Sequence, residues 1–142
     1  MITDTELLNH IRQTTMMGRI GIDAVIHHTA CQPMTDALRQ QRAEYGELCN
    51  AATKMLVQRG GQPEPLGLGA RMGTAMSRVM NAVSPPSTSK IAEMMINGNT
   101  KGVIESIQNH RKYMGRDERV TDLSKKLLET EESNIEQMKP FL

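Results

Sequence analysis

Apolar residues recur every three or four positions in four long stretches of the chain, a spacing that is typical of one face of an α-helix. Turn-forming residues separate the stretches: Pro33, a pair of glycines that begins at Gly60, the run "SPPSTS" and Gly115. Either Thr3 or Thr5 is expected to cap the first helix. The pattern predicts long helices over residues 4–29, 33–59, 88–114 and 117–139, and a short helix over 69–83.

The expected fold class is all-α, because no run of alternating apolar and polar residues is long enough to predict a β-strand. Short turns near residues 30 and 115 are expected to make the helices on either side antiparallel neighbours. The middle connection, from residue 61 to 86, is long enough to run from one end of a bundle to the other. We therefore expect one domain over residues 1–142, a four-helix bundle with a long crossover that contains the short extra helix.

The apolar stripes of the predicted helices also indicate the hydrophobic core, since the side chains that face the other helices of a bundle are buried. On the last helix the inward stripe includes Leu127, Glu131, Asn134 and Met138, so a carboxyl group and an amide are expected to point inward. The apolar residues expected to be mostly buried are Leu7, Ile11, Ile22, Leu38, Tyr45, Leu48, Met55, Ile96, Val103, Leu123, Leu127 and Ile135.

Composition and charge argue against two classes of partner. The chain has 142 residues, of which 38% are hydrophobic, and its 17 basic and 16 acidic side chains are interspersed and give a formal charge of +1. Such a balance creates no field of one sign that would attract nucleic acid or an acidic membrane surface. The three aromatic residues, Tyr45, Tyr113 and Phe141, also leave little to stack on bases. We expect no nucleic-acid partner and no membrane partner.

The expected location is cytoplasmic. The N-terminal stretch "MITDTELLNHIRQTT" is polar and lacks the apolar centre of a signal peptide, and no stretch reaches the roughly 18 to 20 apolar residues of a membrane span. In a reducing compartment the two cysteines, Cys31 and Cys49, are expected to be free thiols rather than a disulfide.

Two segments of the chain carry a resemblance to a known superfamily. The second predicted helix ends in "KMLVQRGGQPEP", before the long connection, and the chain closes with "KKLLETEESNIEQMKPFL". Together with the helix layout, these segments resemble the ferritin-like four-helix-bundle superfamily, which includes rubrerythrins and bacterioferritins, and within it a bacterial branch with degenerate di-iron ligands. Metal-binding members hold two iron ions between one Glu from each of two helices and a Glu-x-x-His pair from each of the other two.

The closing helix carries half of one such pair. Glu131 stands where the resemblance implies a glutamate, but Asn134 takes the place of the histidine, and a neutral amide is a weak ligand for iron. The two lone glutamates are absent from the middle of the first and third long helices. The residues found there instead are Met17, Gly18, Gly21, Gly98, Asn99 and Gly102.

The second helix does not supply a histidine either. Its expected pair falls on Tyr45 and Leu48 or, if the register is shifted by one residue, on Glu44 and Glu47. So few ligands do not suit two iron ions, and we predict no metal, no cofactor and no catalytic residue. The residues left for an alternative, remodelled metal site are Glu44, Glu131 and Asn134.

The glycines near the middle of the helices have two open interpretations, since each glycine inside a helix costs about 1 kcal/mol relative to alanine. They either let the first and third long helices approach closely or mark a local kink, as in "NGNTKG". We predict close approach and no polar cavity for two metals in the middle of the bundle. Asn134 should then be hydrogen-bonded to protein or to water, and Glu131 should be hydrogen-bonded, ion-paired or near solvent.

Two further groups of residues have the spacing of soft-metal ligands. His27, His28 and Cys31 could bind zinc or copper on one side of a helix. A ladder of thioethers suited to Cu(I) is formed by Met72, Met76 and Met80. The favoured interpretations are a solvent-facing helix end with incidental histidines and a packing role for the methionines.

Two functions are compatible with these observations. The favoured one is a metal-free ferritin-like bundle with a structural or protein-interaction role, expected to form a homodimer that buries the short helix with its methionines. The alternative is a metal-binding ferritin-like protein, an oxidoreductase or a metal store, with a remodelled site around Glu131 and Glu44. Whether the chain is an enzyme stays open, with a non-catalytic role favoured.

Overall fold

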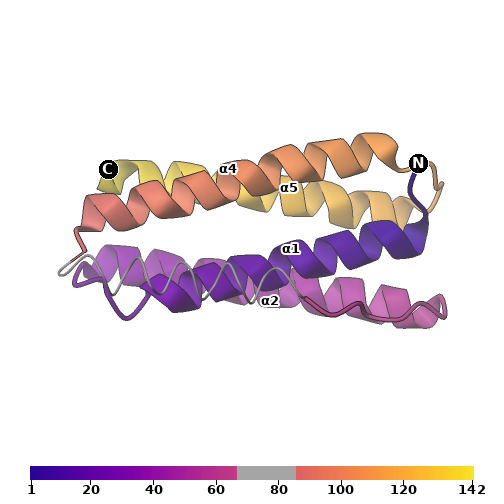
Figure 1. Cartoon of the computed structure of the whole chain (residues 1–142), viewed down its shortest axis with the longest axis horizontal. Helices are drawn as coiled ribbons and strands as arrows, with labels where there is room; N and C mark the ends of the chain where they lie inside the picture. The colour runs from indigo at the N-terminus through magenta and orange to yellow at the C-terminus, as the bar shows by residue number, and fades with distance from the viewer. Residues whose placement is uncertain (67–85) are drawn as a thin grey trace.

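The computed structural model describes residues 1–66 and 86–142, and within these ranges it contains four α-helices and a short 3-10 helix but no β-strand (Figure 1). The all-α prediction is therefore confirmed for this part of the chain. The predicted helix over 69–83, with its thioether ladder, lies outside the described residues. None of the described helices combines the length and apolar character needed to cross a bilayer. The elements are α1 (Asp4–Val25), α2 (Gln32–Gln58), α4 (Thr88–Lys112), α5 (Glu118–Met138) and the 3-10 helix η1 (Lys139–Phe141).

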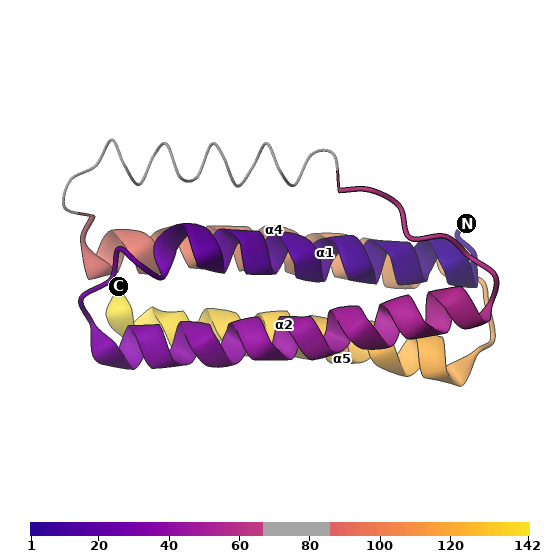
Figure 2. The ribbon, with the colours of Figure 1, turned by 90° about the horizontal axis from the view of Figure 1, so that it is seen from below.

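The four helices pack as two antiparallel pairs. α1 and α2 are antiparallel neighbours, as are α4 and α5, and a short turn joins each pair at one end of the bundle (Figure 1). The first pair packs on the second through contacts of α1 with α4 and of α2 with α5. α2 ends at the end of the bundle where the N-terminus lies, and α4 starts at the opposite end (Figure 2). These two helices therefore run in the same direction, as predicted from the long connection.

Local signals set the start of each helix. Thr3 begins α1 with a capping box: its hydroxyl accepts a hydrogen bond from the Glu6 amide at 3.3 Å, and the Glu6 carboxylate accepts one from the Thr3 amide at 2.7 Å. Ser87 and Asp117 cap α4 and α5 through their side-chain oxygens. α2 instead has Pro33 in its first turn, where a missing amide hydrogen is tolerated.

Two helices end at least two residues earlier than predicted, and the other two end one residue earlier. α1 stops at Val25 instead of residue 29, because the chain turns over the next three residues. α4 stops at Lys112 instead of residue 114, because Tyr113 has an extended backbone and forms an isolated bridge with Ile2. The Ile2 amide donates to the Lys112 carbonyl at 2.9 Å. A distant backbone partner thus replaces the next hydrogen bond of the helix.

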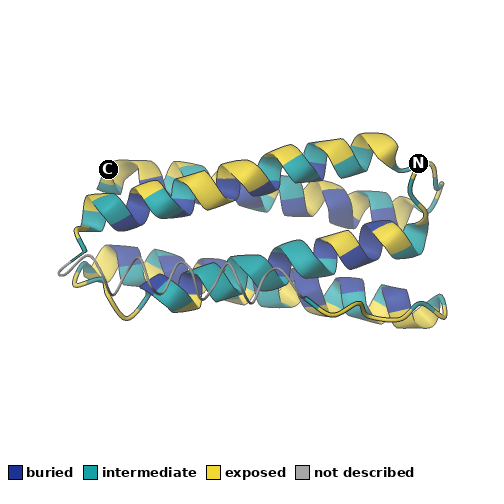
Figure 3. Cartoon of the chain, in the orientation of Figure 1, coloured by how far each residue is buried: buried dark blue, intermediate teal, exposed yellow. Residues whose placement is uncertain are grey.

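The core lies between the two pairs of helices (Figure 3). The predicted core residues that are buried are Leu7, Ile11, Ile22, Leu38, Tyr45, Leu48, Leu123 and Leu127. The other four predicted residues, Met55, Ile96, Val103 and Ile135, are of intermediate exposure, and Met55 and Ile96 pack against the core. On α4 the inward stripe beyond Met95 consists of Asn99, Gly102 and Ser106. Small and polar residues therefore occupy the buried face of this helix, and larger apolar side chains lie on its flanks.

A cluster of ion pairs connects the helices at the end of the bundle where α2 ends. Arg59, the residue after α2, pairs with Asp4 at 3.6 Å and also with Asp117, so it links the starts of α1 and α5. The Tyr113 hydroxyl donates to Asp4 at 2.5 Å. Gly115 lies against the same two side chains, and a Cβ atom at this position would overlap both. We interpret this cluster as a structural tie between three helices.

Candidate functional site

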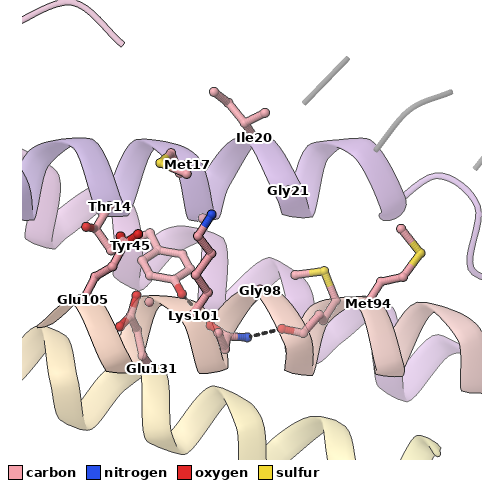
Figure 4. A pocket seen from close by; sticks show the side chains of 14 residues that line it. Thr14, Met17, Ile20, Gly21, Tyr45, Met94, Gly98, Lys101, Glu105 and Glu131 are labelled. Carbon is pink, nitrogen blue, oxygen red and sulfur yellow. Dashed lines mark hydrogen bonds between the residues drawn. The ribbon is translucent and has the colours of Figure 1, made fainter. Parts of the chain in front are cut away.

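A cavity of about 180 Å³ lies between α1 and α4 near the middle of the bundle (Figure 4). Its walls come from these two helices, and Tyr45 of α2 and Glu131 of α5 reach it from the opposite side. Most of the lining is apolar, with Met17 and Met94 among the wall residues. The prediction that α1 and α4 close on each other at this height is therefore wrong.

Two glycines in the walls make room for side chains from other helices. A Cβ atom at Gly18 would lie 2.5 Å from Cε2 of Tyr45, and one at Gly102 would overlap the carboxyl group of Glu131. Both glycines lie inside uninterrupted helices, so they do not mark helix breaks. They admit an inward side chain from another helix instead of bringing two backbones together.

Gly18 and Gly98 line the same cavity but should respond in opposite ways to alanine. Gly18→Ala should lower the free energy of unfolding by about 1 to 3 kcal/mol, because the new methyl group meets the buried ring of Tyr45. Gly98→Ala should raise it by about 1 kcal/mol, because no described atom lies within 4 Å of the added Cβ and alanine favours a helix.

Urea unfolding of the two variants measures this difference. Gly46→Ala is the matched control, because Gly46 also lies in a helix with open space around its added Cβ. It should gain about as much stability as Gly98→Ala. Equal effects at Gly18 and Gly98 would contradict the tight fit of Gly18 against Tyr45.

Glu131 is the single buried carboxylic acid among the described residues, with 2% of its surface exposed. Its Oε2 atom accepts a hydrogen bond from the Ser106 hydroxyl at 3.2 Å, so the prediction of a hydrogen-bonded Glu131 is confirmed. Burial raises the pKa of Glu131 to about 8, against the effect of this hydrogen bond, and the charge of Glu105 raises it further. Glu131 is therefore mostly a neutral acid at pH 7.

Tyr45 extends the polar centre of the bundle toward α4. Its hydroxyl donates to Oδ1 of Asn99 at 2.8 Å, and Nδ2 of Asn99 donates to the Met95 carbonyl at 2.9 Å. Burial raises the pKa of Tyr45 well above its ordinary value, and the charge of Glu131 adds to this. The phenol therefore stays protonated, and both ends of the Asn99 amide are held by hydrogen bonds.

Asn134 is completely buried next to the Tyr45 hydroxyl, whose pKa it lowers, and the prediction that its amide is hydrogen-bonded to protein or water stays a prediction. Neither Oδ1 nor Nδ2 has a hydrogen-bond partner among the described residues. The neighbouring Tyr45 hydroxyl donates to Asn99 instead. A buried amide that lacked all partners would cost about 1 to 3 kcal/mol.

Asn134→Leu should raise the free energy of unfolding by about 1 to 3 kcal/mol, because leucine has a similar size and leaves no polar atom unpaired. The midpoint of urea unfolding measures the gain. Asn97→Leu, on an exposed face of α4, should change it by about 0.5 kcal/mol or less. A loss of stability in Asn134→Leu would mean that the amide is paired in solution.

The fold does not bring together the residues named for a remodelled metal site. Glu131 and Asn134 face inward on α5, but Glu44 is half-buried and accepts a hydrogen bond from Gln40 of its own helix at 3.4 Å. The register of α2 turns Tyr45 inward instead. In residues 1–66 and 86–142, no group of three or more His, Cys, Asp or Glu side chains is placed to hold a metal ion.

The predicted cluster of histidines and a cysteine does not lie on one helix. α1 ends before His27 and His28, which are exposed in the following turn, and Cys31 directly precedes α2. The helical spacing assumed for these ligands therefore does not apply. Cys49 is buried further along α2, about 27 Å from Cys31 at 1.5 Å per residue, so the two cysteines cannot form a disulfide with each other.

Sequence reasoning missed three residues of α4 that surround Glu131. Lys101 and Glu105 line the cavity, and Ser106 donates the hydrogen bond to Glu131. A signal was present, because Asn99, Gly102 and Ser106 follow one another at spacings of three and four. Such a stripe of small and polar residues can be a buried face when the neighbouring helix supplies a polar side chain.

The described residues do not fit the di-iron centre that the resemblance implies. Such a centre needs several carboxylates and imidazoles facing one cavity. Here Glu131 is the single buried carboxylic acid, and none of the buried residues in the described ranges is a histidine. Comparisons with protein-family models, with curated proteins and with solved structures gave no match. Function therefore has to be inferred from the site itself.

Proposed function

We propose that the chain is a metal-free, ferritin-like helical bundle with a structural or protein-interaction role rather than a di-iron oxidoreductase. The observation that carries the proposal is the set of inward polar residues near the middle of the bundle: Tyr45, Asn99, Glu131 and Asn134. This set includes one carboxyl group, and burial raises its pKa to about 8. A single, mostly neutral acid is a poor basis for holding two iron ions.

The course of the chain supports the ferritin-like part of the proposal. α1 with α2 and α4 with α5 are antiparallel, whereas α2 and α4 are parallel (Figures 1 and 2). A bundle with one long crossover connection has this arrangement. The two segments that carry the resemblance lie at the end of α2 and over α5.

Packing of side chains supports the metal-free part. The ring of Tyr45 lies against Gly18, and the carboxyl group of Glu131 lies against Gly102. These two pairs connect α2 with α1 and α5 with α4 at the height where the resemblance implies metal ligands. Contacts between side chains thus join the helices at a height where metal-binding members join them through ligands.

Protein purified without a metal-affinity tag should contain no stoichiometric iron or manganese by elemental analysis. Ferrous iron added in air should be oxidised at the rate of the buffer alone. Asn134→His should behave in the same way, because one imidazole does not replace several missing ligands. Circular dichroism would verify that this variant is folded.

The opposite result would favour the alternative function. Stoichiometric iron or manganese that is lost in Glu131→Gln, but kept in the exposed-acid control Glu132→Gln, would overturn the metal-free proposal. The chain would then be a metal-binding ferritin-like protein, an oxidoreductase or a metal store, with a site around Glu131 and Glu44.

A further inference from the structure

The cavity between α1 and α4 has the size and lining of a small-molecule site. Its volume is about 180 Å³, and an apolar cavity of about 150 Å³ is large enough to hold benzene. Its walls include Met17, Met94 and Gly98, which offer apolar contact without charge. A guest of about six to ten non-hydrogen atoms suits a space of this size.

One side of this cavity carries a buried acid with a free oxygen. Oε2 of Glu131 accepts the hydrogen bond from Ser106, whereas Oε1 makes no hydrogen bond with any described residue. Tyr45 also lines the cavity, close enough to Glu131 for the carboxylate charge to raise its pKa, and its hydroxyl donates to Asn99. Glu131 and Tyr45 thus supply polar groups to the wall of a mainly apolar space.

The charges around the cavity favour a cation over an anion. When ionised, Glu131 and Glu105 contribute two negative charges, and Lys101 contributes one positive charge. The part of α1 that lines the cavity has no titratable side chain. The groups on the other helices that face Glu131 or its neighbours are Glu105 and Lys101 of α4 and Tyr45 of α2, with Glu44 close to Tyr45.

We propose that this cavity binds a small organic amine, with the ammonium group at the Glu131 carboxylate and the apolar part between α1 and α4. A buried carboxylate without a cation is costly, and an ammonium group offsets that cost through a charge-assisted hydrogen bond. The aromatic ring of Tyr45, which also lines the cavity, can attract the ammonium group through a cation–π interaction. The inference goes beyond the proposed function and rests on it in one respect, that Glu131 holds no metal.

Binding of the amine releases one proton. At pH 7 Glu131 is mostly protonated, since burial raises its pKa to about 8, and the bound ammonium group favours the ionised form. The proton passes to solvent, and no other bond forms or breaks. Affinity for the amine should therefore rise about tenfold per pH unit between pH 6 and 8 and level off above pH 8.

Benzylamine and benzyl alcohol test the inference, because they share their size and apolar part but differ in charge. Titration calorimetry at pH 8 should give benzylamine a dissociation constant at least about tenfold lower than that of benzyl alcohol. Glu131→Gln should abolish this preference. Gly98→Leu should abolish the binding of both compounds, because the added side chain enters the cavity without meeting a described atom at its Cβ.

Two matched controls should bind benzylamine as the wild type does. Glu132→Gln removes an exposed acid of the same helix, and Gly46→Leu enlarges a helical glycine that does not line the cavity. Circular dichroism would verify that all four variants are folded. A titration of the wild type at pH 6 should show the weaker binding of benzylamine.

Three results would overturn the inference. Benzyl alcohol that binds as tightly as benzylamine would make the cavity a site for neutral molecules. Benzylamine affinity that is unchanged in Glu131→Gln would place the amine elsewhere. The absence of binding in a preparation shown by elemental analysis to be metal-free would leave the proposed function intact and contradict the amine site alone.

Discussion

Glu131→Gln is expected to remove a decline in stability that the wild-type protein shows between pH 4.5 and 8. Burial of this side chain, with 2% of its surface exposed, raises its pKa from 4.5 to about 8. In the unfolded chain it ionises at the ordinary pKa, so folding takes up a proton at any pH between the two values. The stability that the protonated acid provides is complete below pH 4.5 and is lost as the pH rises to about 8.

The size of this effect follows from proton linkage. One pH unit changes the free energy of unfolding by about 1.4 kcal/mol while the folded and unfolded states differ by one proton. Between pH 4.5 and 8 the wild type should therefore lose up to about 5 kcal/mol relative to the variant. Urea unfolding across this range measures it.

The comparison isolates Glu131, because the four histidines and the Arg59–Asp117 pair are present in both proteins. Glu132→Gln, which changes an exposed acid of the same helix, should keep the wild-type profile. Parallel profiles for the wild type and Glu131→Gln would mean that Glu131 ionises in the folded protein at its ordinary pKa.

Leu127→Ala is expected to lower the free energy of unfolding by about 2 to 5 kcal/mol. Leu127 has 2% of its surface exposed, and it shares a cavity of only about 10 Å³ with Leu7 and Ile11 of α1. Removal of its side chain leaves a void that α1 and α5 cannot close without losing contacts elsewhere. Urea unfolding followed by circular dichroism measures the loss.

Ile104→Ala is the control for this substitution, because Ile104 is 52% exposed and should contribute about 0.5 kcal/mol or less. An unchanged unfolding midpoint for Leu127→Ala would show that α5 packs in another register. Glu131 and Asn134 follow Leu127 on the same stripe, so that result would also contradict their inward placement.

The starts of the helices and the buried face of α5 could be predicted from the sequence. Thr3, Pro33 and Ser87 act on backbone groups within one helical turn, so their effect does not depend on the rest of the fold. The same holds for the stripe through Glu131 and Asn134, because the period of a helix places residues on one face whatever they pack against.

The buried face of α4 could not be predicted in this way. Apolar spacing favoured Ile96 and Val103, whereas the structure buries Asn99, Gly102 and Ser106. Both stripes have helical spacing. Which of them is buried depends on the side chains that the other helices place against α4. Tyr45 and Glu131 pack against α4. Asn99 and Ser106 form hydrogen bonds with them, and Gly102 leaves room for the Glu131 carboxyl group.

Short-range signals were sufficient for the all-α class, the helix starts and the antiparallel pairs, because capping, proline and apolar spacing operate within a few residues. Long-range packing was needed to assign a role to the glycines. Gly18 meets Tyr45 and Gly102 meets Glu131, each on a different helix. A glycine in a helix permits either close approach of a second helix backbone or entry of a large side chain from another helix. The size of the side chain that the other helix places there decides between the two. The raised pKa of Glu131 has the same origin, since it follows from burial among helices that are separated along the chain.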